Sequence, residues 1–117
     1  METDNTRPVE TRKAIVKRLT RGIEEARTAS LSLYVIADSR DYAPLRISGQ
    51  RLALSGGKVI STNERKHAQE IADEVNTQYR ANKFDLRVEV METLAWRARR
   101  VERLLELLAS AELKRGA

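Results

Sequence analysis

Apolar positions along this chain follow two different spacings, which predicts a mixture of helices and strands. Three segments carry apolar residues at helical spacing: 8–28, 61–82 and 93–113. The segments between them are short, alternating or rich in β-branched residues, and predict strands at 31–37, 45–48, 52–54 and 84–90, with a short extra strand at 59–60. The order α-β-β-β-α-β-α favours an α+β fold, with a mostly antiparallel sheet of three to five strands covered by helices.

Local signals place the turns and helix ends. Ser61 followed by Glu64 has the spacing of a capping box and predicts the start of the second helix. Asn82 is suited to end that helix in a left-handed conformation. The segment 55–58 (SGGK) predicts a hairpin turn. Gly22 weakens the first helix, so we expect it to mark close packing against a neighbour. Residues 1–7 are expected to form a flexible tail, and residues 8–115 one domain.

The last predicted helix has two unusual faces. The apolar stripe that we expect to pack on the sheet consists of Leu94, Ala98, Val101, Leu105 and Leu108. The nearly opposite side carries Trp96, Arg100, Arg103 and Leu107, flanked by Arg97 and Arg99. That second face has three readings: a protein interface or dimer seam, a nucleic-acid surface, or burial of the helix on both sides with Trp96 under the first helix.

Composition narrows the chemistry. The chain has 117 residues, 22 Lys and Arg against 17 Asp and Glu, one His and no Cys. A net charge of +5 favours acidic partners such as nucleic acid or an acidic protein. The lack of Cys excludes disulfides and Cys-based metal sites and fits a cytoplasmic location. No apolar run approaches the length of a membrane span, so no membrane association is expected.

Three groups of side chains have residue types that could carry chemistry. Glu64, His67, Glu70 and Glu74 share the spacing of metal ligands, but a solvated helix face is the favoured interpretation. Asp38 and Asp41 are interpreted as turn residues rather than as an acid–base pair. The segment 55–58 lacks the spacing of a phosphate loop. We therefore expect no catalysis, no metal and no cofactor.

Residues 9–80 run helix, three strands, helix, and this order resembles the double-stranded RNA-binding domain. The second helix begins Arg65-Lys66-x-Ala68, which looks like the basic helix start by which that family grips phosphates across a duplex groove. Glu64 and Gln69 depart from that family's pattern. The resemblance implies phosphate contacts from Arg65 and Lys66.

Together these features predict a non-enzymatic basic module that docks on nucleic acid or a ribonucleoprotein by neutralising phosphates. The alternative is a protein-interaction adaptor or inhibitor, of the kind found in phages and mobile elements, that uses the Trp96 face against an acidic protein or as a homodimer. The candidate contact residues are Lys13, Lys17, Arg18, Arg21, Arg46, Arg51, Lys58, Arg65, Lys66, Trp96, Arg97, Arg99, Arg100, Arg103 and Leu107.

Overall fold

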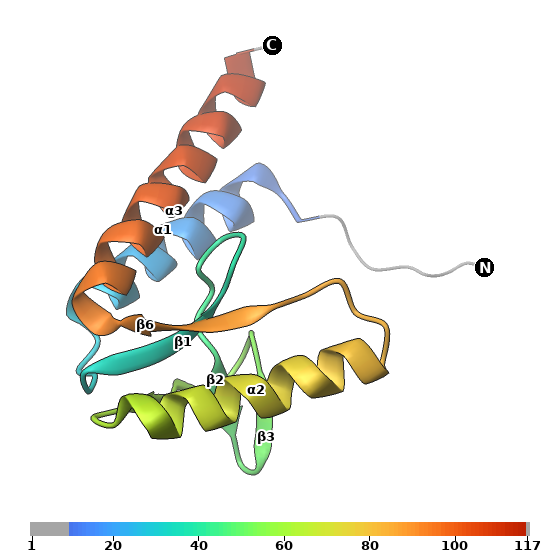
Figure 1. Cartoon of the computed structure of the whole chain (residues 1–117). Helices are drawn as coiled ribbons and strands as arrows, with labels where there is room; N and C mark the ends of the chain where they lie inside the picture. The colour runs from blue at the N-terminus through green and yellow to red at the C-terminus, as the bar shows by residue number, and fades with distance from the viewer. Residues whose placement is uncertain (1–9, 117) are drawn as a thin grey trace.

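A computed structural model describes residues 10–116 of the chain, and their side chains as far as residue 112 (Figure 1). It confirms the α+β class, with three helices and two small antiparallel sheets among these residues. The helices are α1 (Arg12–Thr28), α2 (Arg65–Ala81) and α3 (Thr93–Gly116). The strands are β1 (Tyr34–Asp38), β2 (Arg46–Ser48), β3 (Arg51–Ala53), β4 (Lys58–Val59), β5 (Ser61–Thr62) and β6 (Val88–Glu92).

The strands divide into two sheets instead of forming the single sheet expected from the sequence. Sheet A has the order β5-β1-β6, and its central strand pairs Ile36 with Val90. Sheet B has the order β3-β2-β4, so β3 and β4 both pair with β2 and not with each other. The prediction of a hairpin at 55–58 is therefore wrong. A Cβ on Gly57 would lie 2.2 Å from the carbonyl oxygen of Ile47, so a closely packed glycine there lets β4 run beside β2.

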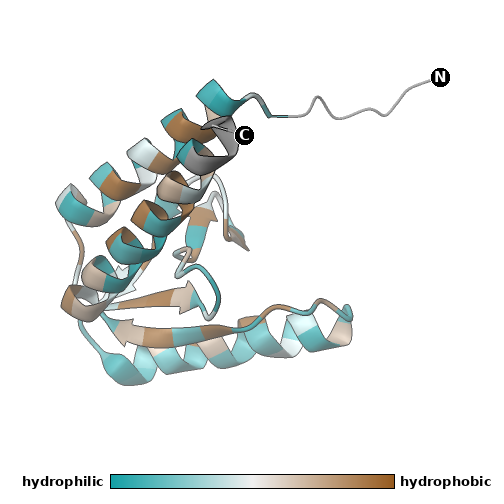
Figure 2. Ribbon diagram, turned by 90° about the horizontal axis from the view of Figure 1, so that it is seen from above, coloured by the Kyte–Doolittle hydropathy of each residue, from teal (hydrophilic) through white to brown (hydrophobic). Residues whose placement is uncertain are grey.

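Helices cover both faces of sheet A. α2 packs against one face, where Ile36, Leu45 and Val88 meet its alanines in a buried cluster. α1 and α3 lie side by side and antiparallel on the other face (Figures 1 and 2). Gly22 allows their close approach, as predicted, because a Cβ at this position would lie 2.9 Å from Cδ1 of Leu104. The core thus consists of one apolar cluster on each face of β1 and a third cluster between α1 and α3.

Several element boundaries differ from the predictions. The predicted tail 1–7 and the helix start at Pro8 lie outside the described residues, and α1 begins at Arg12 with Thr11 as its cap. Ser61 is no helix cap, because it pairs with Val35 in sheet A. Backbone pairing at the sheet edge therefore replaces the capping box, and α2 starts at Arg65 without a side-chain cap.

Two further predictions at the end of α2 and along β6 are wrong. Asn82 has a φ of −94°, and the left-handed residue is Lys83 with a φ of 60°. The predicted strand at 84–90 is displaced to Val88–Glu92, and Phe84 is exposed. Asn76, buried in α2, explains the later start: its amide donates to the carbonyl of Val88 and accepts from the Val88 N–H. Sequence alternation alone carries no information on such a contact.

The buried side of α3 differs from the prediction, because Trp96 is enclosed and part of the predicted packing stripe is exposed. Trp96 is 0% exposed and Leu104 is buried, whereas Leu94 is 81% and Leu105 45% exposed. Of the predicted stripe, Val101 packs against the cluster that contains Val35 and Ala37 of β1, and Leu108 packs against the cluster between α1 and α3. The prediction is wrong for Leu94, Ala98 and Leu105, which are exposed. The third reading of the Trp96 face is correct in placing Trp96 under α1, because α3 is covered on that side by both α1 and β1. Its expectation that the helix is buried on both sides is wrong, since Leu94 and Leu105 are exposed. Burying the large indole removes more apolar surface from water than burying a leucine.

Candidate basic groove

A groove of about 700 Å³ lies between α1, α3 and sheet B. α1 supplies one wall, the Arg100–Leu107 part of α3 supplies a second, and the segment Leu54–Gly56 with Arg46 closes the third side. Six of the predicted contact residues line it: Lys17, Arg18, Arg21, Arg46, Arg100 and Leu107. The fold thus gathers cations from three segments that are far apart in the sequence.

Two of the groove's arginines are bound to carboxylates. Arg46 donates to Glu25 in a bidentate pair, with Nη1 2.7 Å from Oε2, and its side chain is only 17% exposed. Arg18 pairs with Glu10 at 3.1 Å on the exposed side of α1. Lys17 and Arg21 have no ion-pair partner among the described side chains, and both are exposed. The available positive charge of the groove therefore lies along α1.

Arg100 forms the buried end of the groove. Its Nη1 donates to the carbonyl oxygen of Asp41 at 2.8 Å. Burial lowers the pKa of Arg100 from its ordinary value, and Asp38 opposes this by favouring the charged form. The carboxylates of Asp41 and Glu25 also favour its charged form, so the guanidinium is a partly buried cation close to acidic side chains.

The adjacent turn fixes this part of the wall. Oδ1 of Asp38 accepts the backbone N–H groups of Arg40 and Asp41, at 2.9 and 2.7 Å, which confirms the turn interpretation of these aspartates. Nε of Arg103 donates to Asp41 at 2.8 Å, and this hydrogen bond, with another to Glu106, raises the pKa of Arg103. The guanidinium of Arg103 therefore stabilises the turn and is not free to bind a ligand in the groove.

Trp96 and Arg97 have structural contacts too. Trp96 Nε1 donates to the carbonyl oxygen of Tyr42 at 2.8 Å. The guanidinium of Arg97 donates to the carbonyls of Ala26 and Ala29, at 2.9 and 2.7 Å, and so binds the C-terminal end of α1. The face that the sequence singled out on α3 is mostly a set of internal contacts.

The remaining predicted residues are dispersed. Lys13 is exposed on α1, one turn before Lys17, and Arg99 is exposed on α3. Arg51 and Lys58 are exposed on sheet B. Arg65 and Lys66 begin α2, on the opposite side of sheet A from α1, and the guanidinium carbon of Arg65 lies 5.9 Å from the centre of the Tyr34 ring. The phosphate contacts implied by the resemblance would thus form a separate surface.

The predicted metal-like spacing on α2 leads to no cluster. Glu64, His67, Glu70 and Glu74 are all exposed, as the interpretation of a solvated face requires. Among the described residues no group of three or more His, Asp or Glu side chains is placed to hold a metal ion.

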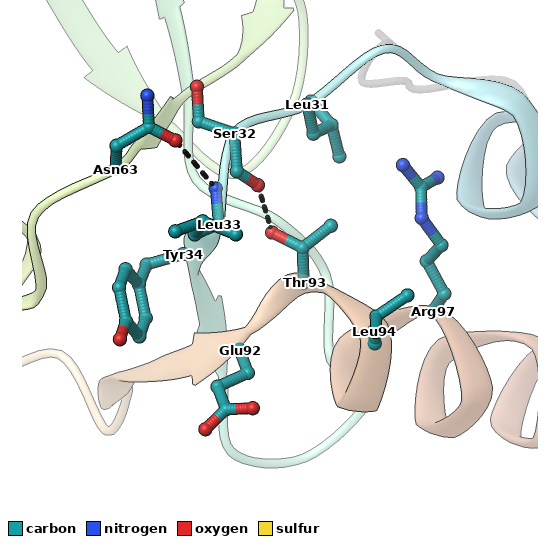
Figure 3. Close-up of a pocket in the computed structure, with 9 residues that line it drawn as sticks. All are labelled: Leu31, Ser32, Leu33, Tyr34, Asn63, Glu92, Thr93, Leu94 and Arg97. Atoms are coloured by element: carbon teal, nitrogen blue, oxygen red, sulfur yellow. Dashed lines mark hydrogen bonds between the residues drawn. The ribbon is translucent and has the colours of Figure 1, made fainter.

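A second hollow of about 460 Å³ opens where β1 and α3 begin (Figure 3). Thr93 Oγ1 donates to the carbonyl of Ser32, and Oδ1 of Asn63 accepts from the N–H of Leu33 at 3.3 Å. These contacts hold the start of α3 and Asn63 against the segment that leads into β1, and Leu33 and Leu94 are exposed beside them. Polar and charged side chains, among them Glu92 and Arg97, line the hollow together with the leucines.

Sequence reasoning missed the contribution of 54–56 and of the α1–α3 contact to the groove. The sequence favours a hairpin turn over a phosphate loop at Ser55 and Gly56, and nothing local indicates that these residues line a groove with α1. Comparison with models of known protein families, with curated proteins and with solved structures finds no match to this chain. None of the described helices combines the length and apolar character needed to cross a membrane.

Proposed function

We propose that this protein is a non-enzymatic module that binds the phosphate backbone of nucleic acid in the groove between α1 and sheet B. The observation that carries the proposal is the convergence of Lys17, Arg21 and Arg100 on one groove, with Arg18 and Arg46 beside them. The proposal also assumes a cytoplasmic location, where nucleic acid and ribonucleoproteins are accessible.

The distribution of charge favours a long anion over a small one. Lys13, Lys17 and Arg21 follow one another at steps of four residues, so their Cα atoms rise by about 6 Å per step along α1. Such a row matches an extended chain of phosphates better than a single phosphate. No aromatic side chain lines the groove among the described residues, which supports contacts to the backbone rather than base stacking.

The test is fluorescence anisotropy with a labelled duplex and a labelled single strand at several salt concentrations. Lys17→Ala/Arg21→Ala removes two exposed cations without breaking a described ion pair, and should weaken binding roughly tenfold or more and lower the salt slope by about 2. Arg80→Ala/Arg87→Ala changes net charge equally on the α2–β6 side and should have little effect.

Equal losses in the two double variants would refute the groove as the site, because they would show dependence on net charge alone. Binding that does not weaken with salt would refute phosphate neutralisation as the mechanism.

A further inference from the structure

A third hollow, of about 340 Å³, opens between the first two turns of α1 and the C-terminal part of α3. The apolar part of its wall consists of Ile15 and Leu19 from α1 and of Leu107 and Ala111 from α3, and Ser110 supplies a hydroxyl. A small cavity with mostly apolar walls and a few polar groups is typical of a site for a small molecule. We call it the apolar hollow.

Two arginines also line the apolar hollow. Arg12 links α1 to α3, because its Nη2 donates to Oε1 of Glu112 at 3.1 Å. The Nε of the same guanidinium is buried and has no hydrogen-bond acceptor among the described residues. Since buried donors are almost always paired, this nitrogen indicates an acceptor that the described side chains do not supply. Arg18 adds a second positive charge, although it is paired with Glu10 at 3.1 Å.

The ion pair of Arg12 leaves room for a different acceptor. The side chains of Arg12 and Glu112 are 38% and 52% exposed, and a pair at such a position adds little stability. Glu112 accepts a hydrogen bond from Nη2 and leaves the neighbouring Nε unpaired. A carboxylate bound in the hollow would accept from Nε and Nη2 together, which is the two-bond arrangement that arginine favours with carboxylates.

The remaining space fits an apolar tail of limited length. A methylene group occupies a volume similar to that of a water molecule, about 30 Å³, so the hollow accommodates about ten non-hydrogen atoms. Octanoate is a saturated carboxylate of this size. A peptide fits less well, because of the described side chains that line the hollow only Ser110 could accept from its backbone N–H groups.

We propose that the apolar hollow binds a medium-chain fatty acid in its carboxylate form. The carboxylate accepts from the guanidinium of Arg12, and the tail packs against the apolar side chains of α1 and α3. Arg18 lies at the same hollow and favours a negatively charged head group over a neutral one. This binding is independent of the proposed nucleic-acid binding.

The test is isothermal titration calorimetry of the full chain with three probes: octanoate, octanol as an uncharged molecule of the same length, and acetate as an anion without a tail. Octanoate should bind with a dissociation constant of roughly 1 mM or lower. Octanol should bind at least about tenfold more weakly, because it cannot satisfy the guanidinium as a carboxylate does. Acetate should show no measurable binding.

Two variants test the assigned contacts. Arg12→Gln keeps much of the side-chain length but removes the charge, and should weaken octanoate binding at least about tenfold. Ala111→Phe places a ring in the hollow and should abolish octanoate binding, while circular dichroism shows whether the fold is kept. Arg99→Gln, at an exposed arginine of α3 that does not line the hollow, is the matched control and should leave the affinity unchanged.

Three results would overturn the proposal. The first is the absence of octanoate binding at millimolar concentrations, and the second is acetate binding as tight as that of octanoate, which would show an adventitious ion only. The third is an octanoate affinity that Arg12→Gln leaves unchanged. Unchanged binding in a folded Ala111→Phe variant would likewise place the ligand elsewhere, and if that variant does not fold, Arg12→Gln decides.

Discussion

Replacing Trp96 with phenylalanine separates a structural role of this residue from a binding role. Trp96 is 0% exposed and packs with Ala26, Val35 and Ala37. Phenylalanine keeps an aromatic ring in that cluster but removes the Nε1 donor, which leaves the Tyr42 carbonyl without this hydrogen bond. We therefore expect Trp96→Phe to lower the free energy of unfolding and to leave the residues that line the basic groove unchanged.

The magnitude follows from two terms. An unpaired buried carbonyl costs about 1–3 kcal/mol. The smaller ring leaves a cavity of roughly 40 Å³, which at about 24 cal/mol per Å³ adds about 1 kcal/mol. The expected loss is thus about 2–4 kcal/mol, against a typical domain stability of about 5–15 kcal/mol, so the variant remains folded at room temperature.

Urea denaturation followed by circular dichroism measures the loss, because the variant no longer carries the indole as a fluorescent probe. Phe84→Leu, at an exposed aromatic position, is the control and should change stability by less than about 0.5 kcal/mol. A similarly small change in Trp96→Phe would refute the burial argument. A large loss of nucleic-acid affinity in a stably folded Trp96→Phe variant would instead restore the binding role inferred from sequence.

Two further predictions test contacts that position the sheets. Asn76→Leu should destabilise the domain by about 2–4 kcal/mol in urea denaturation, because it leaves the N–H and carbonyl of buried Val88 without their Asn76 partner. Asn82→Ala removes an exposed amide at the C-terminal cap of the same helix and should cost less than about 1 kcal/mol. Equal effects would contradict this reasoning. In thermal unfolding, Gly57→Ala should destabilise the domain more than Gly49→Ala. Both glycines have positive φ values (72° and 64°), but only at Gly57 would the new Cβ meet backbone atoms. The reverse order would show that the close approach of Gly57 to Ile47 is relieved by a local shift.

Only part of the basic groove can be predicted from residue types and their spacing. Lys17 and Arg21 could be identified as exposed cations because they lie on the polar side of an amphipathic helix. Their proximity to Arg46 and Arg100 could not be predicted, since it depends on how α1, α3 and sheet B pack together. The same long-range packing assigned Arg97 and Arg103 to internal hydrogen bonds, although their spacing on the helix resembled a binding face.

For this protein the sequence by itself determined the element types, their order and the α+β class, because helical and alternating spacings are local properties of the chain. It also correctly indicated the close helix contact at Gly22 and the turn at Asp38. Only the tertiary structure decided the division into two sheets and which face of α3 is buried. The apolar residues of α3 extend around more of the helix than α1 and β1 cover. Because Trp96 packs between α1 and β1, Leu94 and Leu105 on the other side of the helix are left exposed.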